Sequence, residues 1–223
     1  MPFKLHVLAF ALMASFLFSF NTAKKCTRVV FFGDSITEAG IIPGGYIAQI
    51  RDTLLASGKS KQYELIGSGI GGNKIYDLYL RLEDDVLARK PNVVVLYVGV
   101  NDVWHKQLFG TGTDADKFQK FYAALIHKFQ KKGIRVIVCT PACIGERHGG
   151  ENPMDAELDR FSEIIRTVAQ GENIPLCDFR KAFLDNSSKN NPDNLEHGIL
   201  TTDGVHLNAM GNRLVAEMLL KQI

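Results

Sequence analysis

Short apolar runs alternate with segments of helical periodicity along most of the chain. Runs rich in Val, Ile, Leu, Phe and Tyr predict five buried strands, at residues 28–32, 63–66, 92–98, 134–140 and 174–178. Between them, apolar residues recur every three or four positions, as at Tyr46, Ile50 and Leu54, which predicts amphipathic helices. Strands that alternate with helices form right-handed crossovers. We therefore predict an α/β fold, a three-layer α/β/α sandwich around a five-stranded parallel sheet.

The first 23 residues follow a different pattern. Lys4 precedes an uncharged apolar run at residues 7–20, and a small residue, Ala23, follows soon after the run. The run is shorter than the roughly 20 residues that a helix needs to cross a bilayer. We interpret residues 1–23 as a signal peptide and residues 24–223 as the mature domain, with an uncleaved anchor as the alternative. The predicted location is exported, either periplasmic or secreted, with no stable membrane anchor after the signal is removed.

Composition and charge favour a globular protein and argue against a disordered or nucleic-acid-binding one. With 46% hydrophobic and 22% charged residues, the 223-residue chain is typical of a globular domain rather than a disordered one. Lys and Arg number 26 against 24 Asp and Glu, with no block of five like charges, which argues against a nucleic-acid partner. Cys139 and Cys143 lack the spacing of a zinc knuckle. In an exported protein, Cys139 and Cys177 are the better candidates for a disulfide, because each ends a predicted neighbouring strand.

Parallel sheets of this kind bind their ligands in the crevice outside the carboxyl ends of the strands. The loops predicted there are 33–45, 67–74, 99–113, 141–153 and 179–206. Two stretches, 99–113 and 185–202, are polar and rich in Gly, Asn, Ser and Asp, and we expect them to be the longest loops on the functional side.

The first and last of these loops carry the residue types of nucleophilic catalysis. Gly33-Asp34-Ser35 comes directly after the first strand, where a sharp turn into a helix would expose a serine Oγ beside backbone amides. Asp203 precedes His206 by three residues, so that its carboxylate could fix the imidazole tautomer and leave Nε2 as a base. Taken alone, the first motif is equally typical of a helix N-cap and the second of a surface turn.

Two intermediate loops supply hydrogen-bond donors. Gly69-Ile70-Gly71-Gly72-Asn73 follows the second strand, and Gly99-Val100-Asn101-Asp102 follows the third. A glycine-rich turn can bring a backbone N–H close to a substrate oxygen, and an asparagine amide adds two donors. Taken alone, each is also typical of a structural turn.

Together, these four motifs resemble those of the SGNH hydrolases, the GDSL-type esterase superfamily, over essentially the whole mature chain. The resemblance implies a flavodoxin-like sandwich with Ser35 as nucleophile, His206 as general base and acid, and Asp203 as its partner. It also implies an oxyanion hole made of the Ser35 amide, Gly72 and Asn101. Such an enzyme transfers an acyl group to water through an acyl-enzyme and needs no cofactor or metal.

The sequence departs from the superfamily pattern around the second loop. Gly67 stands where many members have Asn, and Asn73-Lys74 replaces a common acidic-then-hydroxyl pair. These departures affect the placement of Gly72 and leave the other motifs intact. The remaining histidines, at 105, 127, 148 and 197, show no metal-ligand spacing, and we expect them to be solvated or to line the rim of the site.

The predicted substrate is a small acyl ester, with acetyl on a carbohydrate or a similar polar group as the leading case. The alternative is a lysophospholipase or acyl-thioesterase, whose apolar groove Trp104, Leu108 and Phe109 could line. We expect Trp104 to bind substrate and close a short acyl pocket, beside a flexible arm at Gly110 and Gly112. An acyltransferase with the same triad and a non-catalytic carbohydrate-binding relative are further alternatives.

Overall fold

The computed structural model describes residues 26–223, so the predicted signal peptide lies outside the described residues. Its core is a five-stranded parallel sheet in the order β2-β1-β3-β4-β5. The strands are β1 (Thr27–Gly33), β2 (Tyr63–Gly69), β3 (Val93–Tyr97), β4 (Arg135–Cys139) and β5 (Leu176–Cys177). This order is that of flavodoxin-like sandwiches, and it confirms the predicted architecture.

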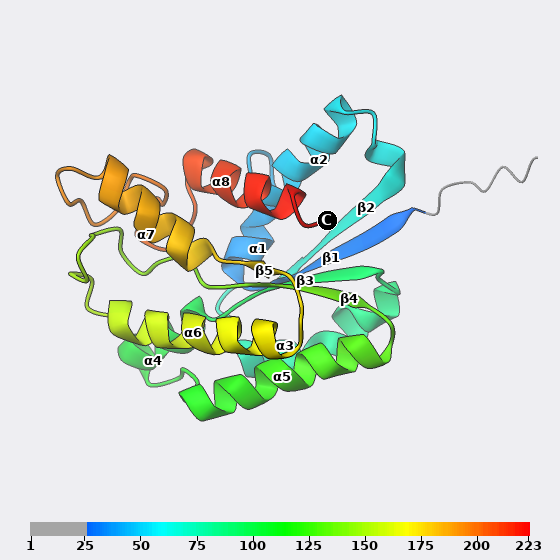
Figure 1. The fold of residues 1–223 in the computed structure, drawn as a ribbon, viewed down its shortest axis with the longest axis horizontal. Helices are drawn as coiled ribbons and strands as arrows, with labels where there is room; N and C mark the ends of the chain where they lie inside the picture. Colours follow the sequence, from blue (N-terminus) through cyan, green and yellow to red (C-terminus); the bar gives the residue numbers. More distant parts are fainter. Residues whose placement is uncertain (1–25) are drawn as a thin grey trace, which may run out of the picture.

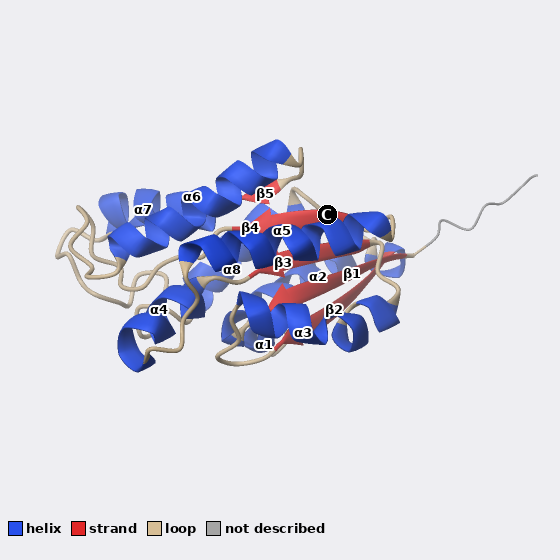
Figure 2. Cartoon of the chain, turned by 90° about the horizontal axis from the view of Figure 1, so that it is seen from below, coloured by secondary structure: helices blue, strands red, loops and turns tan. Residues whose placement is uncertain are grey.

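Helices cover both faces of the sheet (Figure 1). One face is covered by α1 (Ser35–Gly40), α2 (Tyr46–Ala56) and α8 (Ala209–Leu220), and the other by α3 (Ile75–Asp85), α5 (Ala115–Lys131) and α6 (Asp155–Gly171). The remaining elements are α4 (Val100–Phe109), α7 (Phe179–Asn190) and the short 3-10 turns η1 (Ser60–Gln62) and η2 (Leu87–Arg89). Figure 2 shows α4 and α7 toward the end of the molecule where the strands finish.

The strands form where the sequence is continuously apolar. Every residue of β3 is buried, and so are the last five of β1, because helices cover both faces of these central strands. β5 is shorter than predicted, since Pro175 has no N–H to donate and the ladder to β4 is limited to two residue pairs. In that ladder Cys139 lies opposite Cys177, and both thiols are free.

Residues 99–113 are not the loop that we predicted. Most of the stretch is α4, because Val100 and Val103 are buried and give this segment an apolar side at helical spacing. Gly110 ends the helix in the left-handed conformation, with φ of 69°. At Gly112 a side chain would collide with Lys106, so close packing explains this glycine. The start of 179–206 is likewise helical, as α7. Within residues 26–223, no helix is both long and apolar enough to cross a membrane.

Candidate active site

The turn between β1 and α1 presents Ser35. Asp34 caps α1 by accepting a hydrogen bond of 3.0 Å from the N–H of Ile36, and Ser35 is the first residue of the helix. Gly33 makes the turn tight enough, because a side chain there would collide with Thr37 and with the carbonyl of Tyr97. The serine hydroxyl therefore sits at the end of a central strand, beside the N-terminus of a helix.

The hydroxyl of Ser35 meets His206 from the other end of the chain. Ser35 Oγ lies 3.0 Å from His206 Nε2, and His206 Nδ1 lies 2.7 Å from Asp203 Oδ2. The other carboxylate oxygen of Asp203 accepts the N–H groups of Val205 and His206. The structure thus joins Ser35, His206 and Asp203 in one chain of hydrogen bonds.

The electrostatics of the Asp203 carboxylate favour its ionised form. Burial acts to raise its pKa, but the hydrogen bonds from His206 and from the two N–H groups outweigh burial and hold the pKa below its ordinary value. The side chains of His206 and Asp203 are 38% and 49% exposed. An ionised carboxylate can stabilise an imidazolium, and the exposure shows that this side of the site is open to solvent.

The glycine loop after β2 lies beside Ser35. A side chain at Gly71 would come 3.9 Å from Ser35 Cβ, and the Gly71 N–H donates to Glu38 Oε2 at 2.9 Å. Gly72 has φ of 74°, which favours glycine, and its carbonyl accepts a hydrogen bond of 3.0 Å from Lys74 Nζ. The carbonyl of Gly72 is therefore held by Lys74.

Asn101 and Asp102 lie at the start of α4. Asn101 is buried, and its Nδ2 donates one hydrogen bond of 3.1 Å to the carbonyl of Asn73, which leaves its second amide hydrogen for another acceptor. The Asp102 carboxylate accepts the N–H of Ile75 at 3.2 and 3.3 Å, at the start of α3. Burial raises the pKa of Asp102 to about 7. Asn101 therefore contacts the glycine loop, and Asp102 binds the start of α3, the helix that follows this loop.

Arg81, on α3, braces this region, and nothing in the sequence indicated it. Its Nη2 donates to the carbonyl of Gly33 at 2.8 Å, and its Nε donates to Asn73 Oδ1 at 2.7 Å. Further hydrogen bonds reach the hydroxyl and carbonyl of Ser68, and Asp85 forms an ion pair with the guanidinium. One side chain thus ties the ends of β1 and β2 to the glycine loop.

An aromatic line extends from His206 along α4. The ring of Trp104 lies 6.3 Å from that of His206 and 5.7 Å from that of His105, which in turn lies 5.3 Å from Phe109. Burial and the charge of Lys74 hold the pKa of His105 below its ordinary value. His105 also approaches Gly72, so Trp104 and His105 border the histidine and the glycine loop respectively.

The sequence-predicted site residues gather at one end of the sheet. Hydrogen bonds and ring contacts join Ser35, His206, Asp203 and Trp104, while Gly72 and Asn101 meet through the glycine loop. Among residues 26–223, no group of three or more His, Cys, Asp or Glu side chains is placed to hold a metal ion.

Comparison with known proteins finds acetylxylan esterases among the relatives of this chain. The structure of an acetyl xylan esterase, AlAXEase, is 58% identical, with a TM-score of 0.87 over 88% of this chain and 99% of that chain. The acetylxylan esterase of Geobacillus stearothermophilus is 26% identical over 88% of this chain and 93% of its own length. Solved catalytic mutants of that enzyme replace a serine, an aspartate or a histidine with alanine, and they cover 89% of this chain and 95% of theirs, at 25% identity with TM-scores of 0.77 to 0.78.

A third relative, an uncharacterized lipoprotein of Bacillus subtilis, is 25% identical over 85% of this chain and 86% of its own length. The sequence profile of the GDSL-like Lipase/Acylhydrolase family matches residues 31–214. The chain therefore belongs to this family of SGNH hydrolases and is a carboxylic ester hydrolase.

Proposed function

We propose that Ser35 attacks the ester carbonyl, that His206 takes and returns the proton, and that Asp203 orients His206. The observation that carries this proposal is the chain of hydrogen bonds of 3.0 and 2.7 Å from Ser35 Oγ through His206 to Asp203. His206 would give the Ser35 proton to the leaving alcohol, which yields an acyl-enzyme, and then activate water to release the acid. The catalytic serine, aspartate and histidine of the Geobacillus stearothermophilus enzyme support the assignment.

In this proposal, the oxyanion hole is formed by the N–H groups of Ser35 and Gly72 and by the free amide hydrogen of Asn101. The Gly71 N–H is already bonded to Glu38, and the Gly72 carbonyl is held by Lys74. These contacts fix the loop before substrate arrives, as electrostatic stabilisation of a developing oxyanion requires.

The substrate class in this proposal is a carbohydrate that carries acetyl esters. Two relatives are acetylxylan esterases, one of them 58% identical in sequence. The half-exposed His206 and Asp203 side chains also suit an ester that projects from a larger polar molecule, because the leaving alcohol stays in solvent. Export to the periplasm or the medium fits a polymeric substrate, and the lipoprotein relative and the apolar N-terminal run support it.

A lysophospholipase or acyl-thioesterase is the second candidate. Leu108 and Phe109 are 50% and 66% exposed on α4, and together they offer an apolar surface near the site. The two candidates differ in the dependence of kcat/KM on acyl length. An acetylesterase should hydrolyse acetyl and propionyl esters well and octanoyl esters poorly, because a chain that does not fit costs the alignment of its carbonyl with Ser35. A steady rise of kcat/KM from C2 to C12 would favour the lipid substrate.

Ser35→Ala tests the proposal directly. With purified residues 24–223, acetate release from acetylated xylooligosaccharides should fall almost to background, since the nucleophile is lost while the fold is kept. Ser57→Ala, a serine at the end of α2, is the matched control and should keep wild-type turnover. Near wild-type turnover by Ser35→Ala would contradict the assignment.

A further inference from the structure

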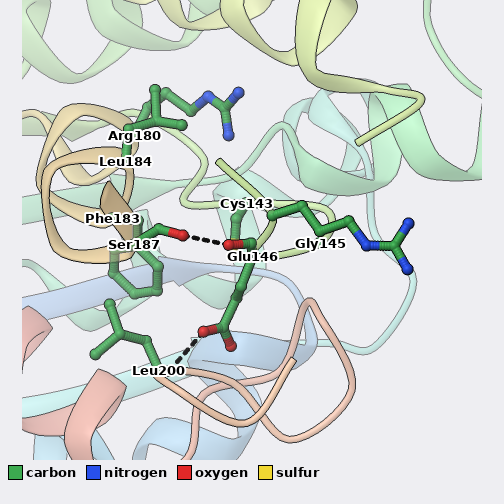
Figure 3. Close-up of a pocket in the computed structure, with 9 residues that line it drawn as sticks. Cys143, Gly145, Glu146, Arg180, Phe183, Leu184, Ser187 and Leu200 are labelled. Carbon is green, nitrogen blue, oxygen red and sulfur yellow. Dashed lines mark hydrogen bonds between the residues drawn. The ribbon is translucent and has the colours of Figure 1, made fainter. Parts of the chain in front are cut away.

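A buried carboxylate outside the proposed triad holds the chain that leads to Asp203. Glu146 follows β4 and is only 4% exposed. Its Oε2 accepts the N–H groups of Ile199 at 3.0 Å and Leu200 at 2.9 Å, and its Oε1 accepts the N–H of Thr201 at 2.6 Å and the Thr201 hydroxyl. Figure 3 shows the side chain reaching toward Leu200. Four donors on three consecutive residues therefore converge on one carboxylate.

Those donors lie at the entrance to the turn that carries Asp203 and His206. Thr201, held by Glu146, uses its hydroxyl oxygen to accept the N–H of Gly204 at 3.0 Å. The carbonyl of Gly204 accepts the N–H of Gly145, the neighbour of Glu146, at 2.8 Å. The turn is thus tied to the segment after β4 on both sides of Asp203.

The backbone of Glu146 is fixed from a third direction. Its carbonyl accepts a hydrogen bond from the Ser187 hydroxyl (Figure 3). The same carbonyl accepts a second hydrogen bond, of 2.9 Å, from Asn191 Nδ2, while the Glu146 N–H donates to the carbonyl of Glu196 at 2.8 Å. The cavity beside Glu146 has a volume of about 10 Å³, space for about one water. The carboxylate therefore has a rigid base and little room to move.

No cation neutralises this carboxylate within salt-bridge distance, as far as residues 26–223 are described. The nearby Arg147 pairs with Glu196, and Arg180 pairs with Asp155 and Asp159. An ionised carboxylate only accepts hydrogen bonds, so three N–H groups and a hydroxyl can satisfy it. In a glutamine at this position, the two hydrogens of the amide nitrogen would point at groups that are themselves donors. The arrangement is consequently specific for an acid.

We infer that Glu146 is a positioning residue for ester hydrolysis, which sets the turn of Asp203 and His206 so that Nε2 reaches Ser35 Oγ. The inference rests on the proposed roles of Ser35, Asp203 and His206. Misplacement of a catalytic group by about 1 Å can cost about 10²-fold in rate, so a looser turn lowers turnover even in a fully folded protein.

The test is Glu146→Gln, with Asp155→Asn as the matched control. Both residues are 4% exposed, and each change replaces a carboxylate with an amide of the same shape, which removes one negative charge. Asp155 accepts hydrogen bonds from Arg180 and Asn152, which lie outside residues 199–207, so its loss should weaken the fold without releasing the turn. The melting temperature of each variant is measured first. Turnover of 4-nitrophenyl acetate and the low-field proton NMR signal of His206 Nδ1–H are then measured well below both melting temperatures.

We expect Glu146→Gln to lower kcat about 10- to 100-fold with little change in KM, and to shift or lose the NMR signal. Asp155→Asn should melt at a lower temperature and yet keep both kcat and the signal. Wild-type kcat and an unchanged signal in folded Glu146→Gln would overturn the inference, as would equal losses of kcat in both variants.

Two further variants keep the result interpretable. If Glu146→Gln does not fold, Thr201→Val removes the hydroxyl that links Glu146 to Gly204 and should lower kcat in the same way; wild-type kcat there overturns the inference. An active Ser35→Ala would instead refute the proposed triad, whereas an inactive Ser35→Ala beside a normal Glu146→Gln refutes only the role of Glu146.

Discussion

We expect the Asp34 carboxyl to make the protein less stable as pH rises, and we expect Asp34→Asn to remove this loss of stability. The Asp34 carboxyl is 2% exposed, next to the proposed nucleophile. Burial, and to a lesser degree the charge of Asp102, raises the pKa of Asp34 from 3.8 to about 7, against the opposing hydrogen bond from Ile36. Between these values the folded state binds a proton that the unfolded state has released, so stability falls as pH rises through this window.

The magnitude follows from that window. Each unit between the folded and unfolded pKa values corresponds to about 1.36 kcal/mol, so between pH 5 and pH 7.5 Asp34 should cost the wild-type protein about 2–3 kcal/mol. Asparagine does not titrate, and its Oδ1 can still accept the N–H of Ile36, so the helix cap survives. The free energy of unfolding of Asp34→Asn should therefore exceed that of the wild type increasingly as pH rises.

Urea unfolding followed by circular dichroism, from pH 5 to pH 7.5, measures this difference. Asp84→Asn, at an exposed position of α3, is the control and should follow the wild-type curve. The depressed pKa of Asp203 acts in the opposite sense, but it is common to all three proteins and cancels in the comparison. Parallel pH profiles for wild type and Asp34→Asn would refute the reasoning, because Asp34 would then not carry a raised pKa.

Three further predictions concern the loop and helix around the site. Asn101→Ala should lower kcat about 10²- to 10³-fold with little change in KM, whereas Asp102→Asn should act mainly on stability, as steady-state kinetics and melting curves would show. Trp104→Ala should raise KM for an acetylated xylooligosaccharide more than for ethyl acetate, because its ring lies 6.3 Å from that of His206, the residue that gives its proton to the leaving alcohol in the proposed mechanism; a shift toward longer acyl chains would instead support the predicted acyl pocket. Arg81→Lys should lower the free energy of unfolding by about 2–3 kcal/mol in urea, since a lysine cannot reproduce the forked contacts to Gly33 and Asn73.

The sheet and the site motifs could be predicted because each depends on local sequence. Strands buried on both faces must be apolar where they are buried, and the sequences of β1 and β3 follow this rule. Motifs that directly follow parallel strands must meet at one edge of the sheet, which places Ser35 near the glycine loop without any knowledge of the packing. The helix α4 escaped prediction because Asn101, Asp102 and the glycines around it gave the stretch the composition of a loop.

The contacts that hold the site together could not be predicted, and the reason is physical. Arg81 sits in α3 with an acid four residues later, the pattern of an exposed ion pair, yet its guanidinium also binds Gly33, 48 residues away. Glu146 bonds residues more than 50 positions later in the chain. In both cases these distant partners, the carbonyl of Gly33 and the N–H groups of Ile199 and Leu200, are backbone groups, which every residue carries, so no side-chain pattern marks them. Backbone groups of loops lack the regular partners of helices and strands, so a charged side chain can fix a loop by binding them. Here Arg81 holds the carbonyl of Gly33, next to the turn of Ser35, and Glu146 holds the residues that lead to Asp203.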